Sequence, residues 1–369
     1  MESEYLRGKF SIIEDRRHPS YVDHILADIL IIVMSAVLCG MDGLAEIMQH
    51  AENRAEFFKD KFGIAQIPSK PTVSRVLNMI NGDAVAQVII EIMKERTDIV
   101  GNIIAVDGKA ITSTSEPGKP NSALQILTAY LTESSVVIGQ HAIHEKTNDI
   151  PVFQAMLGVL AIAGKTITAD AMHCQKETCE RIIAAGGHYV FGLKGNQRTL
   201  HDDVVLFINS EINSDSIETA VTAEKSHGRY EKRNCYKVMD ISWLEGKENW
   251  AGLKSVFAVR RIVTSKGKTT DETSYYITSS DATPDELLRI VREHWKIESM
   301  HWLLDVVFSE DACGLISENG HKTLNIFRKL ALLLHKRHVA SLTRKISIKA
   351  NLLKCLMVDN HLCALIACL

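Results

Sequence analysis

The sequence predicts a mixed α/β fold, in which a helical region is followed by a sheet with helices packed on it. Two observations carry this prediction. Apolar residues recur at helical spacing through residues 1–98. From residue 99, short runs rich in Ile, Val, Leu and Thr are separated by polar or Gly-containing breaks. We therefore expect an N-terminal helical domain over 1–98 and a sheet-containing domain over 99–369.

The most apolar segment of the helical region is "ILIIVMSAVLCG" at 29–40. It is shorter than the ~20 apolar residues that span a bilayer and has Asp28 beside it, so we expect a core helix and no membrane partner. The chain starts without an apolar segment behind a basic one. No secretory signal is expected, which favours a cytoplasmic protein, nucleoid-associated when on DNA.

A break at 63–71 separates this segment from a second helix that begins near Pro71, a residue suited to a first helical turn. Two helices joined in this way are compatible with a helix-turn-helix that presents Thr72, Ser74 and Arg75 to DNA. Packing alone is the interpretation that we favour, because such helix pairs occur in many helical domains, and the N-terminal domain is therefore only a candidate DNA-binding domain.

The sheet-containing region begins with three successive predicted strands, at 102–111, 123–132 and 135–144. Alternating helices and strands follow, namely a helix at 149–164, a strand at 165–172, a helix at 174–187 and a strand at 188–195. A meander followed by this alternation predicts a mixed sheet with helices packed on it.

Acidic residues occupy the ends of two of these strands. We expect Asp107 at the end of the first strand and Asp170 at the end of the fourth, and the carboxyl ends of such strands are where ligands bind. Each Asp alone is also compatible with a turn cap. A third acid, Glu298, lies on a predicted helix over 287–311. Three carboxylates suit Mg²⁺ or Mn²⁺ better than zinc.

Six motifs of this sequence, in order, are "IAVDGK", "TADAMHCQK", "FGLKGNQ", "SHGRYEKR", "YYITSS" and "HWKIESMHWLLDV". Together they resemble the bacterial insertion-sequence transposases of the DDE class, in the branch that contains the H-repeat-associated proteins linked to Rhs elements. The resemblance implies an RNase H-like mixed sheet with helices on both faces. It also implies a β-rich insertion, at about 200–280, before the catalytic Glu.

The resemblance further implies that Asp107, Asp170 and Glu298 are the catalytic triad and hold two Mg²⁺ or Mn²⁺ per active site. Such an enzyme cleaves DNA at the ends of an insertion sequence and transfers the strand to target DNA. Its partner is double-stranded DNA, meaning the terminal repeats and the target, and a homodimer is expected when DNA is bound. One alternative is a catalytically inactive remnant that binds element ends as a regulator. A glycosidase with an Asp/Glu pair ranks last, since only 6% of residues are aromatic.

Candidate DNA contacts follow from the same motifs. They are Lys109, Lys194, Asn196, Gln197, His227, Arg229, Arg233, His294 and Trp295. The broader transposase group has Tyr, Arg and Lys around the Glu where this chain has Val291, His294 and Asp305, so handling of a flipped or hairpin end is left open. A basic amphipathic stretch at 323–350 either lies along DNA or covers the core.

The net charge of −3 gives no general attraction to nucleic acid, so any DNA must be held by local patches. Eight cysteines are scattered without a CxxC pair, which predicts reduced thiols. A zinc site at His173, Cys174 and Cys179 is a weak alternative because no second ligand pair accompanies it.

Overall fold

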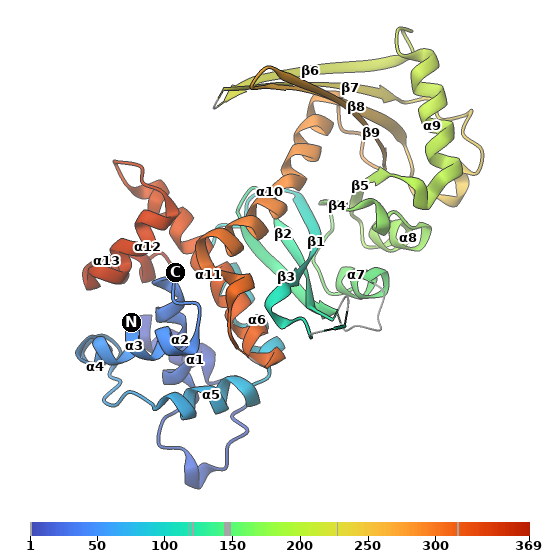
Figure 1. Cartoon of the computed structure of the whole chain (residues 1–369). Helices are drawn as coiled ribbons and strands as arrows, with labels where there is room; N and C mark the ends of the chain where they lie inside the picture. Colours follow the sequence, from blue (N-terminus) through green and yellow to red (C-terminus); the bar gives the residue numbers. More distant parts are fainter. Residues whose placement is uncertain (1, 117, 120–121, 144–148, 227, 316) are drawn as a thin grey trace.

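The computed structural model describes residues 2–116, 118–119, 122–143, 149–226, 228–315 and 317–369 (Figure 1). Within these residues the sheet has nine strands in the order β3-β2-β1-β4-β5-β9-β8-β7-β6. The strands are β1 (Ile103–Ile111), β2 (Leu124–Leu131), β3 (Val136–Ile143), β4 (Thr166–Ala169), β5 (His188–Leu193), β6 (Ile217–Ser226), β7 (Arg229–Val238), β8 (Ser255–Ser265) and β9 (Lys268–Thr278). Strands β1, β4 and β5 are parallel and the other neighbours antiparallel, which confirms the predicted mixed sheet.

Helices precede, interrupt and follow the sheet. They are α1 (Glu2–Phe10), α2 (Leu26–Leu38), α3 (Leu44–Asn53), α4 (Ala55–Phe62), α5 (Lys70–Met79), α6 (Gly82–Glu95), α7 (Asp149–Leu157), α8 (Lys176–Ala184), α9 (Arg198–Glu211), α10 (Pro284–Phe308), α11 (Glu318–Ser341), α12 (Ile348–Met357) and α13 (Asp359–Ile366). Figure 1 shows α10 and α11 on one side of the first strands and α7 and α8 on the other. Helices therefore cover both faces of this part of the sheet.

The helical prediction for the first region is confirmed. Twelve of the 13 residues of α2 are buried, so this apolar segment is a core helix. Among the described helices, no single one is long and apolar enough to cross a membrane, and the pair α5 and α6 reaches that length and composition only together, with a bend of 89°.

The helical region and the sheet share one hydrophobic core. A single cluster of buried side chains contains Leu6, Ile32 and Ile89 from the first helices together with Ile104 and Leu127 from the sheet. The chain passes from α6 to β1 between residues 95 and 103, where the boundary between the two regions was predicted. One cluster of buried side chains thus contains residues from both sides of that boundary, so the two regions pack against each other.

Strands β6 to β9, preceded by α9, form the segment where the β-rich insertion was expected. They extend the same sheet, because β9 pairs with β5 through the register Phe191↔Ile277. The first half of α10 packs on them, since Leu287 and Val291 belong to one buried cluster with Cys235 and Phe257. Helix α10 therefore links the far half of the sheet to the first strands (Figure 1).

Helix α11 decides between the two alternatives for the basic stretch at 323–350. Its residues 320–335 are all buried, including Lys322, Arg328 and Lys329. Each of these cations has partners inside the protein: Lys322 pairs with Asp83, for example, and Arg328 lies 3.6 Å from Glu310. Because internal partners compensate its charges, this helix lies in the centre of the molecule and not along a DNA surface.

Candidate active site

The two predicted strand-end acids lie next to each other on neighbouring parallel strands. The last pair between β1 and β4 is Val106↔Ala169, and the next residues are Asp107 and Asp170. Strand β4 ends there, and Asp170 precedes a short 3-10 turn. The expectation that Asp107 ends its strand was wrong, because β1 continues to Ile111 by pairing with β2 on its other edge. Both acids nevertheless stand at the same level of the sheet.

Helix α10 crosses this level and turns four side chains toward the sheet, at positions 294, 298, 301 and 305. This spacing of four, three and four residues is one face of a helix. His294 Nδ1 lies 3.0 Å from Thr168 Oγ1, and its Nε2 lies 4.0 Å from Asp170 Oδ1. Further along the helix, His301 Nδ1 lies 3.3 Å from Asp107 Oδ2.

Lys109, two residues beyond Asp107, pairs with Asp305 at 2.8 Å. Glu298 lies between the two histidines in the sequence, its side chain is exposed, and within the described part of the chain no hydrogen bond or ion pair engages its carboxylate. It is thus the one position of this face that the described residues leave without a protein partner.

The protonation of these groups reflects their crowding. Burial raises the pKa of Glu298, the charges of Asp107 and Asp170 raise it further, and Lys194 lowers it, with a raised pKa as the result. Burial also raises the pKa of Asp107, but the hydrogen bond and charge of His301 outweigh it, so the pKa is lowered. Three carboxylates that influence one another form a site of concentrated negative charge.

Burial lowers the pKa of His294, although Asp170 and Asp107 act in the opposite direction. A depressed pKa favours the neutral imidazole, which offers no positive charge to a phosphate. In this structure His294 instead contacts Thr168, the residue before Ala169 at the end of β4. Its prediction as a DNA contact therefore lacks the protonated form on which it depended.

The donor set suits a hard divalent cation, because all three acids offer oxygen ligands and no thiol stands among them. Among the described residues, however, no three His, Cys, Asp or Glu side chains are already grouped as the ligands of an ion would be. Asp107 is turned toward His301, with 20% of its side chain exposed, whereas 58% of the Asp170 side chain is exposed.

The predicted DNA contacts near this site have different surroundings. Lys194 follows the end of β5, is exposed, and lies close enough to Glu298 to lower its pKa. Asn196 and Gln197 donate hydrogen bonds to the carbonyls of Ala171 and Cys174, at 2.7 and 3.0 Å. These two amides therefore hold the loop that follows Asp170, a structural role that the sequence analysis missed.

Other predicted contacts lie further along α10 and in the insertion. The Trp295 side chain is 55% exposed beside the site. Arg229 and Arg233 both pair with Glu231 at 2.6 Å, so one carboxylate already offsets part of their charge. His227 lies outside the described residues.

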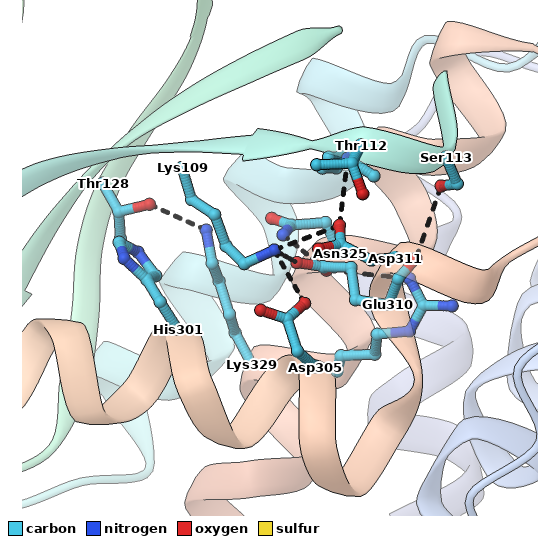
Figure 2. Close-up of polar contacts among 12 residues, drawn as sticks. Lys109, Thr112, Ser113, Thr128, His301, Asp305, Glu310, Asp311, Asn325 and Lys329 are labelled. Carbon is cyan, nitrogen blue, oxygen red and sulfur yellow. Dashed lines mark hydrogen bonds and ion pairs between the residues drawn. The ribbon is translucent and has the colours of Figure 1, made fainter. Parts of the chain in front are cut away.

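Lys109 requires a correction. Its ammonium lies 2.8 Å from Asp305, 3.2 Å from Glu310 and 3.4 Å from Asp311, and only 12% of its side chain is exposed (Figure 2). Burial lowers the pKa of Lys109, but these carboxylates raise it above its usual value. A lysine enclosed by acids is a poor phosphate ligand, so Lys109 has a structural place here.

The sequence analysis also missed His301 and Asp305 as members of the site. The signal was available, because positions 294, 298, 301 and 305 all carry ionisable groups at the spacing of one helix face. What the spacing does not reveal is the strand residue that each group contacts. The zinc alternative has no support: Cys174 and Cys179 are fully buried, and burial raises the pKa of both thiols. A protonated thiol is a poor metal ligand.

Comparisons with known proteins show the family to which the chain belongs. Residues 100–334 match the family described as "Transposase DDE domain", and residues 8–93 match a family described as associated with that domain. The "H repeat-associated putative transposase YhhI" of Escherichia coli K12 is 33% identical over 343 residues, which are 90% of each chain. The "Putative transposase YncI" of E. coli O157:H7 is 33% identical over 345 residues, covering 90% of this chain and 87% of that protein.

An uncharacterised protein encoded in the dhlA 3′ region of Xanthobacter autotrophicus is 34% identical over 280 residues, covering 74% of this chain and 94% of that protein. A solved structure, the piggyBac transposase synaptic complex with hairpin DNA, shares 11% identity at a TM-score of 0.44 and covers 99% of this chain and 77% of that chain.

Proposed function

Because the chain belongs to the transposase DDE domain family, we propose that it cleaves and joins DNA strands with Asp107, Asp170 and Glu298 as its acidic triad. The observation that carries the proposal is the placement of these acids. Two follow the last paired residues of neighbouring parallel strands, and the third faces them from α10 without a protein partner among the described residues. Such a concentration of negative charge is costly unless a cation offsets it.

We also propose an RNase H-like architecture for residues 99–369, preceded by a helical domain over 1–98. The order β3-β2-β1-β4-β5 supports it, with an antiparallel meander followed by two strands parallel to β1. The placement of β6 to β9 between β5 and the triad Glu supports the reading of about 200–280 as an insertion. A contact of the helical domain with DNA, for example through Arg75 on α5, is part of the same proposal.

The triad carboxylates are the residues that would hold Mg²⁺ or Mn²⁺, two per active site in the proposed enzyme. Bound there, the metal ions would activate a water or a 3′-hydroxyl and neutralise the leaving oxygen. The acids act as ligands, so none of them has to carry a proton. His301 fixes one oxygen of Asp107, and Thr168 together with His294 holds the end of β4 beside Asp170.

The proposed reaction has two steps: hydrolysis frees a 3′-hydroxyl at the element's end, and that hydroxyl then attacks a phosphodiester of target DNA. We assign Lys194 to the phosphate, because it is exposed just after the end of β5 and its charge lowers the pKa of Glu298. Arg229, Arg233 and Trp295 remain proposed contacts further along the duplex, and a homodimer on DNA is part of the same proposal. With a net charge of −3, the chain must bind DNA through such local groups.

The test is strand cleavage of a duplex that carries the element's own terminal repeats, with Mg²⁺ or Mn²⁺. Asp107→Asn, Asp170→Asn and Glu298→Gln should each reduce the cleavage rate by at least ~100-fold, because each removes a charge that offsets the cations. Asp285→Asn is the control, since Asp285 is exposed at the far end of the same helix.

A gel shift on the same duplex separates catalysis from binding. Binding should persist or strengthen in the triad variants, because an acid facing phosphates has been removed. Equal loss of cleavage and binding would assign that residue to folding instead. If the unmodified protein binds the repeats but never cuts them, even with Mn²⁺, the regulator alternative replaces the enzyme.

A further inference from the structure

A second set of charged groups lies directly behind the triad and connects the same two elements. Lys109 follows Asp107 by two residues on β1, so both side chains lie on the same face of the strand. Asp305 follows Glu298 by seven residues on α10, so both lie on the same face of the helix. The contacts Asp107–His301 and Lys109–Asp305 therefore join β1 to α10 at successive levels.

The ammonium of Lys109 is the centre of this arrangement. Its three carboxylate partners are Asp305 near the end of α10 and, in the short 3-10 turn that follows, Glu310 and Asp311. Asp311 also accepts a hydrogen bond from the backbone N–H of Thr112, just after β1, at 3.0 Å. One lysine thus fastens the end of β1 to the end of the helix that carries Glu298 (Figure 2).

Helix α11 supports this contact from behind. Glu310 is fully buried, accepts a hydrogen bond from Asn325 at 2.9 Å and lies 3.6 Å from the fully buried guanidinium of Arg328. Lys329, one turn after Asn325 on the helix, donates a hydrogen bond to Thr128 at 2.8 Å. Thr128 is the residue that pairs with Asp107 between β1 and β2. One partner of Lys109, Glu310, is therefore attached to a helix whose residues 320–335 are all buried.

We propose that Lys109 is a positioning residue for the reaction, one that sets the separation of Asp107 and Glu298 by holding β1 against α10. The inference rests on the proposed function, since it assigns those two acids to one site. It differs from a phosphate contact, because an ammonium surrounded by three carboxylates and 12% exposed is directed into the protein. A misplacement of ~1 Å at such a site costs ~100-fold in rate.

The test compares Lys109→Met and Asp305→Asn with the unmodified full-length protein. Lys109→Met should reduce strand cleavage by ~100-fold and weaken Mn²⁺ binding, measured by electron paramagnetic resonance of free Mn²⁺, by ~10- to 100-fold. Asp305→Asn keeps the shape of a side chain that is 33% exposed, so we expect this variant to fold even if Lys109→Met does not. Its Mn²⁺ affinity should fall, as that of Lys109→Met does.

Lys322→Met is the matched control. The Lys322 side chain is even less exposed, at 5%, pairs with two acids, Asp83 at 2.9 Å and Glu318 at 2.8 Å, and belongs to α11 away from the triad. Its loss should lower the melting temperature about as much as that of Lys109 and leave Mn²⁺ affinity within ~2-fold of the unmodified protein. Loss of Mn²⁺ affinity in this control as well would reduce Lys109 to a general contributor to stability and overturn the proposal.

Hydrogen exchange gives a readout that does not depend on catalysis. Amide exchange over 103–111 and 298–311 should rise at least ~10-fold in Lys109→Met but not in Lys322→Met, because only the first loosens β1 from α10. Unchanged exchange in these segments, or unchanged Mn²⁺ affinity in both Lys109→Met and Asp305→Asn, would overturn the positioning role. If the unmodified protein neither binds Mn²⁺ nor cleaves DNA while exchange rises as expected, the proposed function fails but the coupling of the two acids stands.

Discussion

Replacement of Glu310 by Gln should destabilise the protein strongly, because it leaves a buried arginine without its counter-charge. Arg328 and Glu310 are both fully buried, and the Nε and Nη1 atoms of Arg328 have no hydrogen-bond partner among the described residues. The remaining contact of the guanidinium is a 3.3 Å hydrogen bond from Nη2 to the carbonyl of Asp42. Gln keeps the volume of Glu and can still accept from Asn325, so the variant isolates the loss of charge.

The magnitude follows from the kind of contact. Breaking a buried ion pair by removing one partner costs about 3–5 kcal/mol. The 3.6 Å separation exceeds a hydrogen-bond distance, so we expect the lower end, about 3 kcal/mol. Unfolding entropies of ~2.1 cal/mol/K per residue give ~0.8 kcal/mol/K for 369 residues, so the melting temperature should fall by about 4 °C.

Thermal and urea denaturation of the two proteins provide the measurement. Asp271→Asn is the control, because Asp271 pairs with Arg260 at 2.6 Å on the surface, where water screens the pair and it contributes little to stability. The double variant Glu310→Gln with Arg328→Met should recover the part of the loss that comes from the pair with Arg328, while the ion pair of Glu310 with Lys109 stays broken. A Glu310→Gln variant no less stable than Asp271→Asn would refute the idea that Arg328 depends on this carboxylate.

Three further predictions concern DNA, pH and packing. Affinity for duplex DNA should fall by more than ~10-fold between 50 and 200 mM salt, and Lys194→Gln should reduce the magnitude of the salt slope by about 1; gel shifts over a salt series check both. Burial lowers the pKa of His335 to about 4, below its unfolded value of ~6.5, so the unfolded chain binds the extra proton first and stability is lost as the pH falls from ~6.5 to ~4. The variant His335→Gln should therefore lose less stability than the unmodified protein between pH 7 and 4.5 in urea titrations, and equal losses would contradict this. Gly82→Ala should cost ~1–3 kcal/mol, because its Cβ would lie 2.8 Å from the carbonyl of Asn319 on α11; an unchanged urea midpoint would show that α6 and α11 separate easily.

Much of the fold could be predicted because its signals are local. The three strands of the meander were predicted within about one residue of their observed bounds, since each is an apolar run bounded by turn residues. The helix predicted at 149–164 is an exception and ends at Leu157. Its apolar pattern continues past Gly158, a residue that favours termination, so periodicity alone extended it too far.

Helix α11 shows why charge patterns mislead. Lys322, Arg328 and Lys329 indicate a solvated or DNA-facing surface when they are read along the sequence. In the fold, Lys329 donates to Thr128 and Gln140, which lie about 200 residues earlier. Burial lowers the pKa of Lys329 to about 7, so this ammonium loses its proton far more readily than an exposed lysine does. Burial of a cation depends on partners that only the tertiary structure supplies.

The candidate site was predictable to the extent that its chemistry lies in residue types. Asp107, Asp170 and Glu298 could be proposed from strand ends and from the resemblance. The residues that hold the triad in place were not recognised, because the contacts of His301 with Asp107 and of Lys109 with Asp305 join residues almost 200 positions apart. From the sequence, a lysine that follows an acid by two residues can be interpreted as a phosphate contact. In the structure three carboxylates remote in the sequence surround Lys109, so it has a structural place instead.

The face of α10 that meets the sheet contains the strongest argument for a role beyond stability. At three of its four positions the helix residue contacts a residue of the sheet or of the turn that follows β4. His294 contacts Thr168 and Asp170, His301 contacts Asp107, and Asp305 contacts Lys109. A fold selected for stability alone would place a cation or an apolar residue at the fourth level as well. It has Glu298 instead, whose pKa is raised by burial and by the two strand acids, so this carboxylate costs free energy to ionise. Lys194 offsets this cost only in part, so a further positive partner, such as the metal ion that we propose, would favour the ionised form of Glu298.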